Sequence, residues 1–147
     1  MADYVVADTT LFAHLTKASR HSASYERMLG GRRLAASFQT PPELLSAGYG
    51  VKRQQRVDDL LIVTLKLPHS EATDVWYGRV AERRRALKKW AQPGSDASDA
   101  DMWIISSALE YGFPLFSHDK QQVQLGRAMG LRVLTSLDGL KDDNPTI

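Results

Sequence analysis

Four acidic residues stand where strands are expected to end or helices to begin: Asp8, Glu43, Asp101 and Asp119. Hard divalent cations such as Mg²⁺ take oxygen ligands, commonly one or two carboxylates together with waters and phosphate oxygens. A carboxylate pocket that holds such a cation can activate water and stabilise charge on a phosphodiester. The sequence offers no rival site, since it contains no cysteine, no paired histidines at metal spacing, no P-loop and no nucleophile elbow.

Each carboxylate taken alone also has a structural explanation. Asp8 can cap the helix that follows it, and Glu43 stands three residues after Thr40, the spacing of a capping box. Asp101 lies in the first turn of its helix, where a carboxylate complements the helix dipole. Asp119 can simply end a strand and start a turn. Helix capping explains each carboxylate singly, but it explains the presence of all four carboxylates less well, and this favours a shared site.

Short apolar runs along the chain predict strands at Tyr4–Ala7, Leu34–Phe38, Thr64–Leu67, Pro114–Ser117 and Arg132–Thr135. Helical segments separate them, and this alternation predicts a three-layer α/β/α domain with a mainly parallel central sheet. Ligands of such sheets bind beyond the carboxyl ends of the strands. Asp8 and Asp119 each lie just past a predicted strand, so we expect them on the same rim.

Apolar periodicity, capping residues and glycine stops predict helices at Thr9–Lys17, Tyr25–Leu29, Thr40–Tyr49, Gln55–Val63, Ala72–Trp90, Ser98–Tyr111 and Gln121–Met129. A break is expected at Ser19–Ser24. Thr40 is the expected N-cap of the third helix, which begins with two prolines.

The segment Ala72–Trp90 is predicted to carry an apolar stripe of Trp76, Val80, Leu87 and Trp90, with Arg83 in its middle. Its other faces carry five cations: Arg79, Arg84, Arg85, Lys88 and Lys89. A basic surface beside an acidic cluster suits an anionic ligand at a metal site. A solvated helix face explains the same charges equally well.

Length and composition are those of an ordinary globular protein. The chain has 147 residues, 43% apolar and 24% charged, with a net charge of +2. We expect one domain over residues 1–140 and a polar tail over 141–147. The absence of cysteine fits a reducing cytoplasm. No apolar run predicts a membrane span or a signal peptide.

Four segments resemble the acidic motifs of PIN domains: Val5–Leu11, Pro42–Leu45, Asp101–Leu109 and Tyr111–Asp119. The first resembles a strand that ends in Asp-Thr-Ser, and the last resembles a strand that ends in Ser or Thr, any residue, then Asp. The motifs follow one another in order over nearly the whole chain. Size and layout are closest to the VapC-type toxins of type II toxin–antitoxin pairs. Two positions depart from the pattern, Ile105 in the third motif and Lys120-Gln121 after the fourth.

The resemblance implies a metal-dependent endoribonuclease that uses Mg²⁺ or Mn²⁺. It implies that the catalytic and metal-binding residues are Asp8, Glu43, Asp101 and Asp119. Thr9 and Ser117 would be supporting hydroxyls that orient carboxylates or a metal-bound water. Asp99 is a candidate accessory ligand that also needs no function as a cap or loop residue. RNA as substrate, a small antitoxin as partner, a homodimer and a cytoplasmic location are further implications.

Two other interpretations stay open. One is a PIN-type nuclease of RNA processing or decay, outside any toxin pair, which a neighbouring gene for a small DNA-binding protein would distinguish. The other is a binding module that keeps the fold without turnover. The presence of all four acidic residues argues against a non-catalytic binding module, and an activity assay distinguishes the module from a nuclease.

Overall fold

A single parallel sheet forms the centre of the protein. The computed structural model describes residues 3–17 and 20–137, and in these it places five strands. They are β1 (Tyr4–Ala7), β2 (Arg33–Ala36), β3 (Leu65–Lys66), β4 (Leu115–Phe116) and β5 (Val133–Leu134). Their order is β3-β2-β1-β4-β5, and every pair is parallel. The predicted sheet is confirmed, whereas the tail expected over 141–147 lies outside the described residues.

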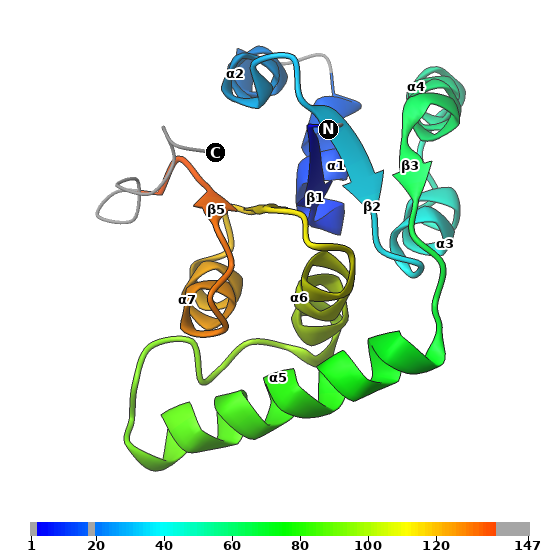
Figure 1. Ribbon diagram of the computed structural model, residues 1–147. Helices are drawn as coiled ribbons and strands as arrows, with labels where there is room; N and C mark the ends of the chain where they lie inside the picture. The colour runs from blue at the N-terminus through cyan, green and yellow to red at the C-terminus, as the bar shows by residue number, and fades with distance from the viewer. Residues whose placement is uncertain (1–2, 18–19, 138–147) are drawn as a thin grey trace.

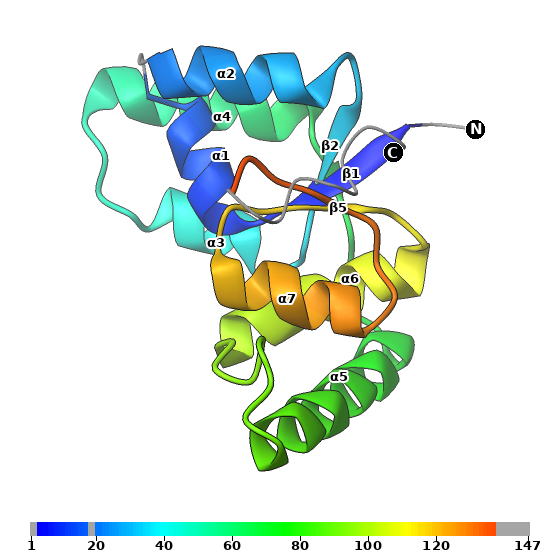
Figure 2. The ribbon, with the colours of Figure 1, turned by 90° about the vertical axis from the view of Figure 1, so that its left-hand side faces the viewer.

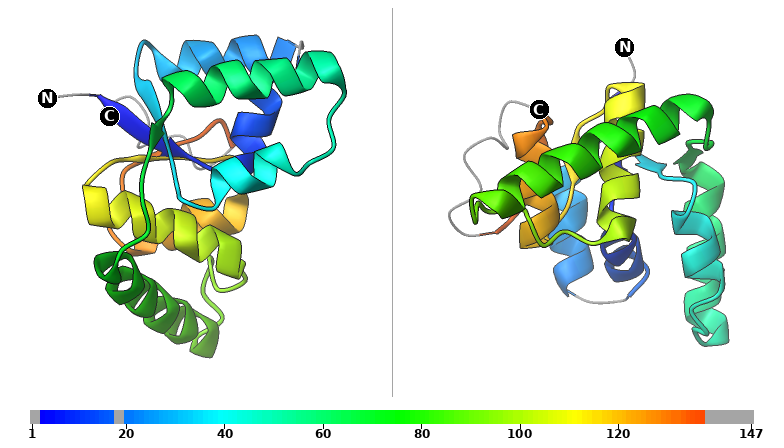
Figure 3. Two further views of the ribbon diagram at one scale, coloured as in Figure 1. Left: turned by 90° about the vertical axis from the view of Figure 1, so that its right-hand side faces the viewer. Right: turned by 90° about the horizontal axis from the view of Figure 1, so that it is seen from below.

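Helices cover both faces of this sheet. They are α1 (Thr9–Leu15), α2 (Arg20–Leu29), α3 (Thr40–Leu45), α4 (Val51–Val63), α5 (Glu71–Lys89), α6 (Asp99–Tyr111) and α7 (Lys120–Ala128). The first four lie on one face and α6 and α7 on the other, with α5 outermost across α6 and α7 (Figures 1, 2 and 3). The three-layer α/β/α arrangement is therefore confirmed. Within the described residues, none of these helices is long and apolar enough to cross a membrane.

The central strand β1 feeds both halves of the core. Val5 and Ala7 pack with the cluster that includes Phe12 from α1, while Val6 packs with the cluster that includes Ile105 from α6. Neighbouring strand residues point to opposite faces. Because both faces are covered, the strand is apolar throughout rather than alternating.

The direction in which the chain adds strands to the sheet reverses between β1 and β4. From β1 it adds β2 and β3 on one side, and later returns to place β4 and β5 on the other. The backbone N–H of Asp8 donates to the carbonyl of Phe116 at 3.2 Å, so β1 and β4 end at the same level. Such a reversal is where open α/β sheets bind ligands. The expectation that Asp8 and Asp119 share a rim is confirmed.

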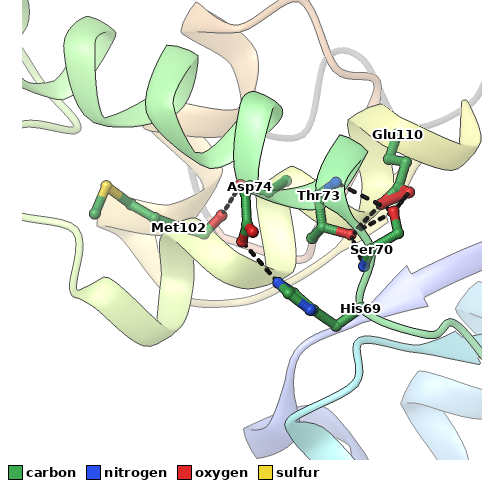
Figure 4. Close-up of polar contacts among 7 residues, drawn as sticks. His69, Ser70, Thr73, Asp74, Met102 and Glu110 are labelled. Atoms are coloured by element: carbon green, nitrogen blue, oxygen red, sulfur yellow. Dashed lines mark hydrogen bonds and ion pairs between the residues drawn. The ribbon is translucent and has the colours of Figure 1, made fainter.

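The start of α5 is fastened to the end of α6. Ser70 caps α5 and closes a capping box with Thr73. Both hydroxyls also donate to the carboxylate of Glu110 in α6, and His69 pairs with Asp74 at 2.6 Å (Figure 4). The two bonds to Glu110 hold the end of α6, whose first turn carries Asp101, against the long outer helix.

Several helix boundaries differ from those predicted. The break expected at Ser19–Ser24 is wrong for its described part, because α2 already begins at Arg20. Neither glycine nor proline interrupts that stretch, and its buried Leu29 packs with the core. The third helix ends at Leu45 rather than at Tyr49, and α4 begins four residues earlier than expected. Gly48, at a φ of 75°, separates the two.

The predicted apolar stripe of α5 is only partly right. Val80 is buried and Leu87 packs against the core, as expected. Trp90, however, is 69% exposed, and Trp76 lies half-buried beneath the guanidinium of Arg79. The packed face is therefore rotated away from the two tryptophans.

That rotation exchanges the roles of two neighbouring arginines. Arg84, predicted to face outward, turns toward the protein and donates to the carbonyl of Ala97 at 2.8 Å. It also pairs with Asp99 at 3.3 Å. Arg83, predicted to lie within the stripe, is exposed instead. Adjacent residues lie about 100° apart around a helix, so a small error in the assumed phase moves a side chain from one face to the next.

Candidate metal centre at the rim of the sheet

Asp8 lies at the end of β1 with only 6% of its surface exposed. One oxygen, Oδ1, accepts the backbone N–H of Leu11 at 2.7 Å and so caps α1. The other, Oδ2, accepts the hydroxyl of Ser117 at 2.8 Å. The pKa of Asp8 is raised to about 6, mainly by burial; the two hydrogen bonds act in the opposite direction, and the negative charges of Asp101 and Asp119 contribute to the rise.

Ser117 connects this carboxylate to the next one. Its hydroxyl is fully buried at the end of β4 and accepts the backbone N–H of Asp119 at 3.1 Å while it donates to Asp8. Asp119 in turn caps α7, because its Oδ1 accepts the backbone N–H of Gln122 at 3.0 Å. The side chain of Asp119 is exposed, so this carboxylate is open to solvent.

Asp101 is the third residue of α6 and forms a capping box with the N-cap Ser98. Its N–H donates to the hydroxyl of Ser98 at 3.1 Å, and its Oδ2 accepts the N–H of Ser98 at 3.0 Å. Its second oxygen, Oδ1, accepts the side-chain amide of Gln122 at 3.2 Å. Burial raises the pKa of Asp101, and the charge of Asp119 adds to this effect.

The three aspartates therefore cap helices and form a common cluster at once. Each uses one oxygen to satisfy a backbone N–H at a helix start, where four such groups lack partners within the helix. In Asp8 and Asp101 the second oxygen takes part in a hydrogen-bond network that runs through Ser117 and Gln122. The capping explanation and the shared-site explanation are thus compatible for these residues.

Glu43 lies apart from this network. The N-cap of α3 is Gln39 rather than the predicted Thr40, so Glu43 is one position too late to close a capping box. Its side chain is exposed and makes no hydrogen bond to the three aspartates within residues 3–17 and 20–137. Its helix does border the site, because Gln39 donates to the carbonyl of Ala100 at 3.0 Å.

The two remaining predicted site residues contact other partners. The hydroxyl of Thr9 bonds to that of Thr40 at 3.1 Å and so ties α1 to α3. Asp99 is 76% exposed at its side chain and pairs with Arg84. The structure therefore places Thr9 between helices and Asp99 against α5, outside the carboxylate network.

A pocket of about 230 Å³ adjoins the cluster, lined in part by Asp8, Asp119 and the rings of Tyr25 and His118. The two ring centroids are 4.6 Å apart. Burial lowers the pKa of His118 to about 4, so this imidazole is neutral near pH 7. Its Nδ1 accepts the backbone N–H of Ser136 at 3.1 Å, which fixes the ring at the pocket wall.

Gln122 is the site residue that sequence reasoning missed. It stands three residues after Asp119, a spacing that indicates only a local capping role. Its long-range bond to Asp101 depends on how α6 and α7 pack, and the sequence contains no sign of that packing.

The donor chemistry of the site fits a hard divalent cation. Asp8, Asp101 and Asp119 offer carboxylate oxygens only. Burial is the main cause of the raised pKa of Asp8, the charges of Asp101 and Asp119 add to it, and a bound cation offsets both effects. Among the residues that the structure describes, no three acidic or histidine side chains are close enough to surround an ion directly. Mg²⁺ requires less than that, because it is usually bound through one or two carboxylates and keeps several waters.

Comparison with known proteins identifies the fold. No family model and no curated protein matches the chain. The solved structure of VapBC2 from Rickettsia felis, bound to a DNA fragment from its promoter, matches with a TM-score of 0.68 and 18% identity over 90% of this chain and 98% of that one. VapBC-1 from nontypeable Haemophilus influenzae matches with a TM-score of 0.64 and 25% identity over 88% and 96%. FitAcB from Neisseria gonorrhoeae matches with 0.55 and 14% over 88% and 96%. This chain therefore has the PIN-like fold of VapC-type proteins.

Proposed function

We propose that this chain is a metal-dependent endoribonuclease that hydrolyses RNA phosphodiesters and serves as the toxin of a type II toxin–antitoxin pair. The observation that carries the proposal is the network of Asp8, Asp101 and Asp119 at the point where the strand order reverses. A site at that point, made of carboxylates whose charges repel one another, suits a cation and a phosphate ligand.

In this proposal Asp8, Asp101 and Asp119, with Glu43 of α3 as a fourth acidic group, bind Mg²⁺ or Mn²⁺ or position the attacking water, so that one or two carboxylates contact the cation directly. When bound, the cation supplies Lewis-acid chemistry to a water and to phosphate oxygens. The chain itself orients the carboxylates: Ser117 holds Asp8, and Gln122 holds Asp101. Water is the proposed nucleophile of an in-line hydrolysis, without a covalent enzyme intermediate.

The similarity to solved protein complexes supports a protein partner for this chain. The similar structures are VapBC and FitAcB assemblies, and this supports a small antitoxin as the partner of this chain. A basic side chain of that antitoxin, an arginine in particular, would complement the exposed carboxylate of Asp119. The homodimer, the cytoplasmic location and the role of Asp99 as an accessory ligand remain proposals of the same kind.

The test is controlled expression followed by cleavage-site mapping on total cellular RNA, with Asp101→Asn as the matched inactive variant. We expect new 5′ ends at a limited set of sites and growth arrest, both absent in the variant and relieved by co-expression of an adjacent small gene. New RNA ends without relief by such a gene would indicate a nuclease outside a toxin pair. Identical RNA ends for both proteins would contradict the nuclease and favour a binding module.

A further inference from the structure

Gln122 occupies a helix position whose usual role is already filled. It is the third residue of α7, three after the N-cap Asp119, where a glutamine commonly reaches back to the N-cap backbone N–H. Here that N–H donates to Ser117 Oγ at 3.1 Å instead. The side chain of Gln122 turns away from its own helix start and donates to Asp101 Oδ1 at 3.2 Å.

Through two different groups, Gln122 contacts two of the three aspartates. Its backbone N–H holds Asp119 Oδ1 at 3.0 Å, and its side-chain amide holds Asp101 Oδ1. These two carboxylates repel each other, as the effect of Asp119 on the pKa of Asp101 shows. A donor that bonds to both therefore counteracts their separation and fixes where each one points.

Stability alone does not account for a glutamine at this position. The side chain is completely buried, and its Oε1 has no hydrogen-bond partner among the described residues. A buried polar atom without a partner costs free energy, and an apolar side chain of the same size avoids that cost. The bond to Asp101 is what an apolar side chain would lose.

We propose that Gln122 is a positioning residue of the metal centre, which aims Asp101 at the cation by donating its side-chain amide hydrogen. The inference rests on the proposed metal-dependent function. Partners of this kind orient a metal ligand, and their loss typically lowers metal affinity or activity about tenfold to a hundredfold. The role is specific to the amide N–H, so an apolar residue of similar length abolishes it.

The experiment compares Gln122→Met with Gln124→Met in purified full-length protein. Gln124 lies on the same helix and also has a side-chain Oε1 without a partner among described residues, but it makes no bond to the three aspartates there. The metal-free protein is titrated with MnCl₂, and the midpoint of the rise in melting temperature is recorded. Steady-state RNA cleavage then gives kcat and KM at a fixed Mn²⁺ concentration.

We expect the Mn²⁺ midpoint of Gln122→Met to rise about tenfold or more above that of Gln124→Met. Its kcat at subsaturating Mn²⁺ falls while its KM for RNA stays unchanged, and its metal-free melting temperature is equal to or above that of the wild type. If methionine does not fit, Gln122→Leu removes the same donor with a different shape and carries the same comparison.

The outcomes separate the two proposals. Midpoints for Gln122→Met and Gln122→Leu within twofold of Gln124→Met overturn the positioning role and leave the ribonuclease proposal intact. A wild type that binds Mn²⁺ but cleaves no RNA contradicts the ribonuclease, while the midpoints still decide on Gln122. A wild type whose melting temperature does not respond to Mn²⁺ overturns the metal centre and this inference with it.

Discussion

The hydroxyl of Ser117 donates to Asp8 Oδ2 at 2.8 Å, across 109 residues of sequence. It fastens the end of β4 to the end of β1, the two strands between which the sheet order reverses. The same oxygen accepts the N–H of Asp119. One buried hydroxyl therefore sets the relative position of two carboxylates in the candidate metal centre.

Replacement of this hydroxyl should impair cleavage more than it impairs folding. In Ser117→Ala we expect about a tenfold or greater loss of kcat and a loss of about 1 kcal/mol of stability from the missing hydrogen bonds. Ser106→Ala is the control, because Ser106 is also buried but donates to the carbonyl of Met102 within its own helix. Rates and unfolding free energies that fall equally in the two variants would contradict the role of Ser117.

Asp101→Asn should keep the fold of the metal-free protein. The asparagine oxygen still accepts the N–H of Ser98, so the capping box of Ser98 and residue 101 is kept. Its amide N–H then faces Gln122, whose unpartnered Oε1 accepts it once that side chain flips. We expect a melting temperature in EDTA equal to or above the wild type, because one of the mutually repelling charges is gone.

Asp101→Ala provides the contrast. It loses the bond from the N–H of Ser98 to the side chain as well as the charge, and should destabilise the protein by about 1 kcal/mol relative to Asp101→Asn. Equal melting temperatures for the alanine and asparagine variants would show that the observed capping bonds do not contribute.

The buried carboxyl of Asp8 should make metal-free stability depend on pH. Its pKa is raised from 3.8 to about 6 in the folded protein, so folding favours the protonated form. The stabilisation is complete below pH 3.8 and is lost as pH rises through 6. Asp8→Asn cannot titrate. Its unfolding free energy minus that of the wild type should therefore increase between pH 3.5 and 7, by up to about 3 kcal/mol.

His118 titrates over the same pH range with the opposite sign. Its pKa is lowered to about 4, so its contribution to stability is lost as pH falls from 6.5 toward 4. Because His118 is present in both proteins, the difference between Asp8→Asn and wild type cancels its effect. A difference that stays constant over this range in chemical unfolding with EDTA would contradict the burial of Asp8.

The exposed cations of α5 should contribute to RNA binding through phosphate contacts. Arg84 is excluded from this set, because it is tied to Ala97 and Asp99. For the triple variant Arg79→Gln, Arg85→Gln and Lys89→Gln, we expect weaker binding and a salt slope flatter by about 2, near 0.7 per lost phosphate contact. Glu82→Gln on the same helix is the control. An unchanged slope at equal melting temperature would show that these charges form only a solvated face.

Features that follow from local sequence patterns are predicted from the sequence, whereas contacts between helices distant in sequence are not. Apolar strands placed Asp8 and Asp119 on one rim, because parallel strands end together and this follows from their pattern alone. The inward turn of Arg84 and the bond from Gln122 to Asp101 were missed. Both contacts depend on how a helix is rotated about its axis relative to its neighbours. The sequence does not define this rotation where a helix face carries few apolar residues.

Local capping was predicted with mixed success for a related reason. Asp101 lies in the first turn of its helix, as expected, and there it also closes a capping box with Ser98 that was not predicted from the sequence. At Thr40 the predicted cap was wrong, since its hydroxyl is recruited by Thr9 of α1. A tertiary contact here overrides the local preference, and it leaves Glu43 without a capping partner.

The most direct test of the central claim is the initial rate of RNA cleavage by purified wild type and Asp101→Asn, each with Mn²⁺ and with excess EDTA. The metal-centre account predicts cleavage only by wild type with Mn²⁺, and a fall of about a hundredfold or more in the other three reactions, as expected when residues of a site act as a unit. Full activity of Asp101→Asn, or wild-type cleavage undiminished by EDTA in nuclease-free preparations, would contradict it.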